Sequence, residues 1–237
     1  MKNNSRIGIL SGIYLLSALF TIISCKYSSQ VKMENDEPSL SSENSFTITG
    51  ERHFVSEYEP LYSDGDINVV VEIPTGTSEK WEVNKISGNI EWEFKYGEPR
   101  IVRYLGYPAN YGMIPGTLAS LESEGDGDPL DAIILGPPVK RGDIVRCRLI
   151  GVLELLDKGV CDDKLITVRA GTHFYEINSI RELDKDFEGV TDILRLWFAN
   201  YKGPGIIEIT GFGDRERAFQ ILESAIEAYR QYGTEDN

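Results

Sequence analysis

The sequence contains few histidines and cysteines, and each shortage argues against a class of chemistry. Only His53 and His173 occur among 237 residues. A Ser-His-Asp or Cys-His hydrolase needs a histidine at its centre, and a zinc site usually takes several. Cys25, Cys147 and Cys161 are too few to staple an exported domain with disulfides. We therefore expect Cys147 to be a buried thiol and Cys161 a loop thiol.

Basic residues are also in deficit. The chain has 24 Lys and Arg against 38 Asp and Glu, which gives a net charge of -14. Residues 1–24 hold two charges, Lys2 and Arg6, so the rest of the chain carries -16. A domain this acidic should repel nucleic acid and anionic membrane surfaces. If it acts on an anion, bound cations must reverse the local charge.

One long apolar run stands at the N-terminus. It extends from Ile7 to Ile23, follows two basic residues and ends in Ser24-Cys25. This layout predicts a signal peptide over residues 1–24, and the small residue before Cys25 resembles the lipobox of bacterial lipoproteins. We expect an exported protein, anchored to a membrane through a lipid on Cys25 and facing the periplasm or the cell surface. A plain transmembrane anchor of about 17 residues is the alternative.

The remaining sequence predicts a flexible tether over residues 25–45 and one folded domain over residues 46–237. The tether is polar and rich in Ser, Asn and Glu. The domain is mainly β, with strand-like patterns over residues 68–74, 81–83, 90–94, 100–104, 131–135, 144–156 and 165–168. Two main C-terminal helices follow, over residues 191–200 and 214–231, with Asp214 as the cap of the second. This order favours a closed β-barrel with helices packed outside.

The densest acidic cluster is Asp126-Gly-Asp128-Pro-Leu-Asp131. Residues two apart in an extended chain point to the same side, and Pro129 could swing Asp131 toward the same point. Carboxylates this close repel one another unless cations lie between them, and oxygen ligands suit Mg²⁺ or Mn²⁺. A solvated acidic loop is the alternative. A calcium EF-hand does not fit, because Leu130 and Pro137 occupy positions that need ligands.

Three further groups carry candidate chemistry, and each has a structural alternative. Asp157, Asp162, Asp163 and Lys164 connect two apolar strands, where a barrel mouth or a plain hairpin turn would place them. The second group contains a charge inside an apolar run and could equally form a cross-strand ion pair: Glu72, Lys80 and Glu82. The third group has cationic and phenolic side chains that can bind phosphate or pack at a core edge: Arg100, Arg103, Tyr107, Tyr111, Tyr201 and Lys202.

Together these segments resemble family I soluble inorganic pyrophosphatases. The resemblance covers Asn68 to Lys202, and its most specific element is Asp-x-Asp-Pro-x-Asp over residues 126–131. Six other elements occur in the same order: Val-Glu-Ile-Pro at 71–74, Lys-Trp-Glu at 80–82, Pro-Arg-Ile-Val-Arg at 99–103, Gly-Tyr-Pro-Ala-Asn-Tyr-Gly at 106–112, the segment 156–164, and Asn-Tyr-Lys at 200–202. The resemblance implies an OB-like closed barrel of the α+β type and hydrolysis of inorganic diphosphate to two phosphates.

The resemblance also implies roles for individual residues. It assigns metal ligation to Asp126, Asp131, Asp162, Asp157 and Glu72. It assigns phosphate binding to Lys80, Arg100, Tyr111, Lys164, Tyr201 and Lys202, with Arg100 preferred over Arg103 because Pro-Arg-Ile-Val-Arg matches the longer, eukaryote-like form. It makes Asp128 the acceptor of the proton of the attacking water, with Tyr107 and Glu82 as further active-site residues. The implied cofactor is Mg²⁺, several ions per site, with Mn²⁺ as a substitute, and we expect a homo-oligomer.

Three other functions are compatible with parts of this pattern. One is a non-catalytic OB-type binding module that has lost activity, and another is a metal phosphohydrolase acting on nucleotides or polyphosphate. The third is a metal-independent glycosidase with paired carboxylates. The complete carboxylate set in the sequence favours the diphosphate hydrolase over the binding module.

Overall fold

A computed structural model describes residues 46–119 and 127–233, and these residues belong to one compact unit. Two residues with predicted roles, Cys25 and Asp126, lie outside the described ranges. Within those ranges, no helix is long and apolar enough to span a membrane.

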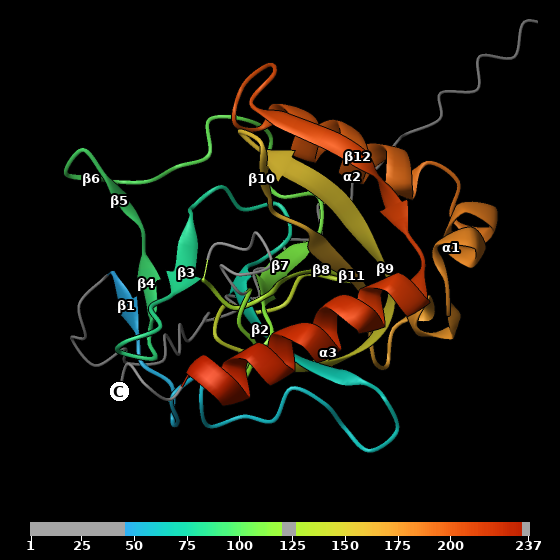
Figure 1. Cartoon of the computed structure of the whole chain (residues 1–237). Helices are drawn as coiled ribbons and strands as arrows, with labels where there is room; N and C mark the ends of the chain where they lie inside the picture. Colours follow the sequence, from blue (N-terminus) through green and yellow to red (C-terminus); the bar gives the residue numbers. More distant parts are fainter. Residues whose placement is uncertain (1–45, 120–126, 234–237) are drawn as a thin grey trace, which may run out of the picture. The chain divides into compact units, whose positions relative to one another are not determined.

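Five strands form a closed ring at the centre of the fold (Figure 1). Strand β9 (Ile144–Asp157) pairs with β11 (Lys164–Arg169), β11 with β8 (Asp131–Leu135), β8 with β7 (Asn110–Met113), β7 with β2 (Ile67–Ile73), and β2 again with β9. The β11–β8 pair is parallel and the other four pairs are antiparallel. Strands β10 (Val160–Cys161) and β12 (Ile207–Gly213) also pair with β9. The predicted mainly β fold with a ring of strands is therefore confirmed.

The ring strands are apolar because both of their faces are covered. In β2, five of the seven residues are hydrophobic and fully buried, and in β8 four of the five residues are buried. β-branched residues such as Val69 and Ile133 suit this pleated, packed setting. Burying each large aliphatic side chain contributes about 1.5–3 kcal/mol. The ring is thus a packed core and a rigid support for the side chains at the ends of its strands.

Three helices pack around the ring. Helix α1 (Ile180–Asp186) is capped by Ser179, α2 (Val190–Asn200) carries Trp197 and Phe198 into the core, and α3 (Arg215–Tyr232) buries Leu222. A short 3₁₀ turn (His173–Glu176) precedes α1. Asp214 caps α3 by accepting from the Arg217 N–H at 2.9 Å. The two predicted C-terminal helices are present, and α1 adds a third that the sequence did not predict.

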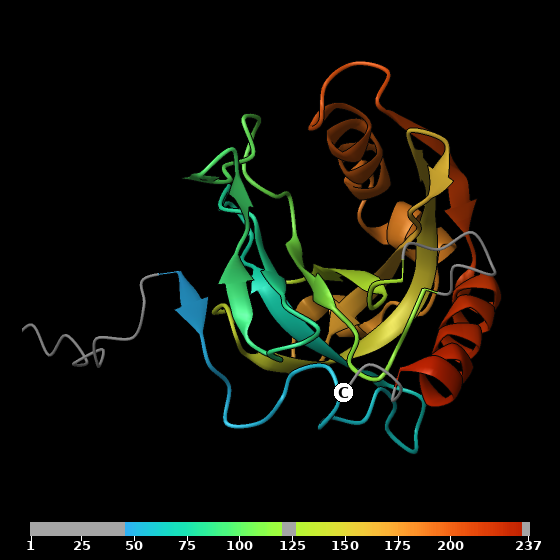
Figure 2. The ribbon, with the colours of Figure 1, turned by 60° about the vertical axis from the view of Figure 1, so that its left-hand side comes forward.

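A second, smaller sheet joins β1 (Thr47–Ile48), β4 (Ile90–Trp92) and β3 (Trp81–Val83). It is followed by the hairpin of β5 (Phe94–Lys95) and β6 (Glu98–Pro99). Figure 2 shows this sheet at the left and β12 with α2 at the right, with the ring strands between them. Its position matters for function because the connections at the ends of β3 carry Lys80 and the turn at residues 84–88.

One predicted strand is wrong, and β7 and β12 were missed, together with the two-residue strands β1, β6 and β10. Residues 100–104 alternate in polarity but form only an isolated bridge, at Ile101 with Glu79, because the segment is mostly exposed. Strand β7 escaped prediction because it contains Asn and Gly, which are poor strand formers. Gly112 is required there, because a Cβ atom would lie 1.8 Å from the carbonyl oxygen of Val70. Strand β12, with two glycines, was missed for the same reason.

Candidate active site

A cavity of about 600 Å³ opens at one edge of the ring, and the strand directions explain its composition. Strands β8 and β11 are parallel, so their first residues, Asp131 and Lys164, lie at the same edge. Strand β9 runs antiparallel to β11 and ends at that edge with Asp157. Asp162 lies two residues before Lys164. Residues far apart in the sequence are therefore brought together at the predicted barrel mouth.

Glu72 reaches this cavity from β2 because the strand is irregular at that point. The pairing of β2 with β7 shifts register between Val71 and Ile73, so Glu72 occupies a β-bulge, a feature that redirects side chains. The carboxylate accepts from the Val83 N–H at 2.7 Å, and Arg141 Nε donates to the Glu72 carbonyl at 2.7 Å. Burial raises the pKa of Glu72 to about 8, although Lys80 opposes the shift.

Every predicted site residue within the described ranges lines this one cavity. They come from five loops and six strands; the predicted metal ligand Asp126 and the predicted lipidation site Cys25 lie outside the described residues. The lining includes Glu72, Lys80, Glu82, Arg100, Tyr107, Tyr111, Asp128, Asp131, Asp157, Asp162, Lys164, Tyr201 and Lys202. Their individual roles stay predictions. The residues converge on one space, and the ion pair between Lys80 and Glu82 that the structural alternative expects is also present.

Lysine ammonium groups lie directly on the carboxylates. Lys164 Nζ donates to both Asp131 and Asp162, and Lys202 Nζ donates to Asp157 Oδ2 at 2.6 Å. Burial opposes the charge on Lys164, but the two aspartates raise its pKa above the ordinary range. At Asp131 burial acts to raise the pKa, but the positive charges of Lys164 and Lys80 outweigh it, so the pKa of Asp131 is lowered. Lys164 and Asp131 thus keep each other charged inside the protein, whereas at Asp162 burial outweighs the attraction of Lys164 and raises the pKa of that carboxyl.

Lys80 and three tyrosines, Tyr107, Tyr111 and Tyr201, also line the cavity. Lys80 Nζ lies 3.4 Å from Glu82 Oε2 and 5.8 Å from the ring centre of Tyr111. Burial opposes the charge of Lys80, but Tyr107, Glu72 and Glu82 raise its pKa. Burial also raises the pKa of Tyr201 to about 12 and lifts the pKa values of Tyr107 and Tyr111 above their ordinary range. These hydroxyls therefore remain neutral donors at physiological pH.

The donor set fits a hard divalent cation. Asp131, Asp157, Asp162 and Glu72 offer only oxygen atoms, which Mg²⁺-type ions prefer. Asp157 Oδ1 is buried and accepts no hydrogen bond from the described part of the chain, so it is an acceptor to which a cation could bind. Among the described residues no three acidic, Cys or His side chains are grouped closely enough to hold one ion. Lys164 and Lys202 donate to the same aspartate carboxylates that would bind a cation.

Sequence reasoning missed several lining residues, among them Asn84, Lys85 and Ile86 from the turn between β3 and β4. It also missed the partner of Arg100, whose guanidinium Nη1 lies 2.5 Å from Glu93 Oε2. A lysine in a polar turn is ordinarily solvated, so no local signal identified Lys85. Arg100 lines the cavity and Arg103 is not among its lining residues, but the role of Arg100 as a phosphate ligand stays a prediction.

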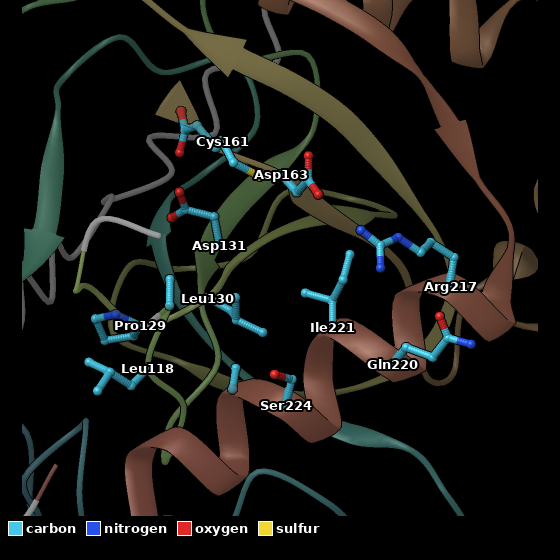
Figure 3. Close-up of a pocket in the computed structure, with 13 residues that line it drawn as sticks. Leu118, Pro129, Leu130, Asp131, Cys161, Asp163, Arg217, Gln220, Ile221 and Ser224 are labelled. Atoms are coloured by element: carbon cyan, nitrogen blue, oxygen red, sulfur yellow. The ribbon is translucent and has the colours of Figure 1, made fainter. Parts of the chain in front are cut away.

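A second cavity of about 200 Å³ lies behind the acidic segments (Figure 3). It shares four lining residues with the larger cavity: Pro129, Asp131, Cys161 and Asp162. Figure 3 shows Arg217, Gln220, Ile221 and Ser224 of α3 on its other side. It contains neither the tyrosines nor the cavity lysines. The larger cavity, with six carboxylates and five basic groups in its described lining, is therefore the candidate active site.

Most of the sequence matches a known family. A family model described as inorganic pyrophosphatase matches residues 69–230. An inorganic pyrophosphatase of Xylella fastidiosa is 34% identical over 170 residues, covering 70% of this chain and 90% of the relative. An inorganic pyrophosphatase of Helicobacter pylori is 34% identical over 185 residues, covering 74% and 98%.

Solved structures agree with the sequence comparison. The type I inorganic pyrophosphatase of Toxoplasma gondii superposes with a TM-score of 0.71 and 26% identity, covering 75% of this chain and 87% of that one. The Helicobacter pylori enzyme gives 0.63 and 31%, covering 73% and 99%. The family model covers more than half of the chain, and the relatives are matched over nearly their full length. The chain belongs to the inorganic pyrophosphatase family, in its soluble family I form.

Proposed function

We infer that this chain hydrolyses inorganic diphosphate to two phosphates in the larger cavity. The main support for this function is that acidic, basic and phenolic side chains line the same cavity. Carboxylates of the kind that hold divalent cations face lysine, arginine and tyrosine donors of the kind that bind phosphate oxygens. A binding module that had lost activity would not need to keep both sets, and a metal-independent glycosidase would not need the basic set.

The carboxylates Asp131, Asp157, Asp162 and Glu72 would hold the cations, which we propose to be Mg²⁺, with Mn²⁺ as a substitute. When bound, such cations lower the pKa of water and neutralise phosphate charge. The raised pKa of Glu72 means that this residue must lose a proton to become a ligand, so cation binding should strengthen with pH.

The chain's own residues bind and orient the diphosphate, and one of them accepts a proton. Lys80, Arg100 and Lys202 provide fixed positive charge for phosphate oxygens, and Tyr111 and Tyr201 donate neutral hydrogen bonds. Asp128 is proposed to accept the proton of the attacking water, whose oxygen forms a bond to one phosphorus as the bridging P–O bond breaks. Its side chain is 59% exposed at the cavity mouth, so water reaches it directly.

The test is release of inorganic phosphate from diphosphate by the purified domain, with and without Mg²⁺. We expect turnover that depends on the cation and is much slower with ATP. Equal rates on ATP and diphosphate would favour a nucleotide phosphohydrolase. No release from diphosphate under any divalent cation would overturn the proposed function.

We propose in addition that the chain is exported, carries a lipid on Cys25 and forms a homo-oligomer. The support for export and for the lipid is the sequence of residues 1–25, with its basic start, apolar run and Ser-Cys ending. Mass measurement of the mature protein from membranes should find an N-terminal Cys25 with added acyl chains. An intact Met1 in the membrane fraction would instead indicate a transmembrane anchor. Sedimentation of the solubilised protein gives the oligomeric state, and a monomer would contradict that part.

A further inference from the structure

Lys85 projects from a turn whose backbone is firmly held. The turn connects β3 and β4, and Asn84 closes it by accepting from the N–H groups of Ile86 at 2.9 Å and Ser87 at 3.1 Å. Two backbone hydrogen bonds of 2.8 Å, from Asn84 to Asn89 and from Gly88 to Asn84, complete it. The base of the Lys85 side chain is therefore fixed, although the side chain is 54% exposed.

From this base Lys85 reaches the Asp128 segment. Its ammonium donates to the Gly127 carbonyl and to Asp128 Oδ1, both at 2.9 Å. The two partners are 42 and 43 residues away in the sequence, and both Lys85 and Asp128 line the candidate active site. A lysine that grips a carbonyl and the next residue's carboxylate at once restrains both the backbone and the side chain.

The backbone of this segment is anchored on its other side. The Ala119 N–H donates to the Asp128 carbonyl at 2.8 Å, and the Gly127 N–H donates to the Ala119 carbonyl at 2.8 Å. The Asp128 side chain itself is more than half exposed, so packing alone does not fix its direction. The hydrogen bond from Lys85 to Oδ1 therefore contributes to the orientation of this exposed carboxylate.

We propose that Lys85 is a positioning residue, which holds the Asp128 carboxylate in the orientation needed for proton transfer. This rests on the proposed function, in which Asp128 accepts the proton. We expect Lys85 to act through Asp128, because two of the three N–H donors of its ammonium are taken by the Gly127 carbonyl and Asp128 Oδ1. Its removal should therefore lower kcat while leaving KM for diphosphate nearly unchanged.

The expected size follows from the exposure of the pair. Exposed ion pairs are weak and screened by salt, so we expect Lys85→Met to lower kcat by about two- to tenfold. Lys85→Arg keeps a charged donor of similar reach and should recover most of the rate. Lys185→Met is the matched control, because Lys185 pairs with Asp186 at 3.3 Å on exposed α1, away from the cavity.

The experiment measures kcat and KM for diphosphate with Mg²⁺ in the full chain and in these three variants, together with their melting temperatures. The proposal predicts a lower kcat for Lys85→Met alone, with KM and melting temperature close to those of the parent. A raised KM at constant kcat would overturn it and make Lys85 a substrate ligand. Unchanged kinetics would overturn it as well. An inactive parent would reject the proposed function, whereas an active parent with an equally active Lys85→Met would reject only this inference.

Discussion

Replacing Glu72 with glutamine should stabilise the metal-free protein and weaken the enzyme. Glu72 is only 3% exposed, and burial raises its pKa from an ordinary 4.5 to about 8. The folded protein keeps this proton up to about pH 8, whereas the unfolded chain releases it near pH 4.5. Between these values the folded state binds more protons, so the free energy of unfolding falls as pH rises. Glutamine does not titrate and avoids this loss.

The magnitude follows from the same two pKa values. Each pKa unit corresponds to 1.36 kcal/mol, so the full loss above pH 8 is at most about 5 kcal/mol. Half of this upper value would shift the melting temperature by about 5–10 °C in a domain of this size. Glutamine also keeps an oxygen that can accept from the Val83 N–H, so the native hydrogen bond is retained.

The assay is thermal unfolding in a chelator between pH 5 and pH 9. The melting temperature of Glu72→Gln minus that of the parent should grow with pH and level off above pH 8. Glu98→Gln, on the exposed β6, is the control for loss of a carboxylate at the surface. A difference that stays constant across this pH range would refute the reasoning.

Three other predictions concern the acceptor, the cation and the fold. Asp128→Asn should lower turnover by orders of magnitude with an unchanged circular dichroism spectrum, and turnover like that of the parent would reject its role. A chelator should abolish phosphate release and added Mg²⁺ should restore it; activity that persists after dialysis against the chelator speaks against the cation. Gly112→Ala should fail to accumulate as soluble protein, because its Cβ would lie 1.8 Å from the Val70 carbonyl oxygen. A soluble variant with the parent's melting temperature would contradict that packing.

Sequence reasoning found the strands whose own residues are mostly apolar or β-branched, because such runs indicate a buried strand without knowledge of the neighbouring strands. Strands β2 and β8 are β-branched runs, and β9 and β11 are long apolar segments beside turn residues. Strand β7, with the sequence Asn-Tyr-Gly-Met, is a strand only because β2 and β8 flank it. Residues 100–104 show the reverse case: their alternating polarity is real, but their hydrogen bonds go to single groups at Ser78, Lys80 and Glu93.

The site was more predictable than the contacts inside it. Motifs at the ends of strands converge because antiparallel and parallel pairing brings those ends to one edge. The contact of Lys164 with both Asp131 and Asp162 depends on side-chain geometry across 33 residues, which no local pattern specifies. The same applies to Lys85 and Asp128, which meet only in three dimensions.

The central claim is that oxygen ligands from separate segments hold divalent cations in one cavity. Anomalous diffraction from crystals grown with Mn²⁺ tests it most directly. We predict Mn²⁺ peaks within the cavity, in contact with Asp131 and Asp162, with the Lys164 ammonium moved off these carboxylates. Crystals with Mn²⁺ bound elsewhere on the protein, and Lys164 still seated between the two aspartates, would contradict the account.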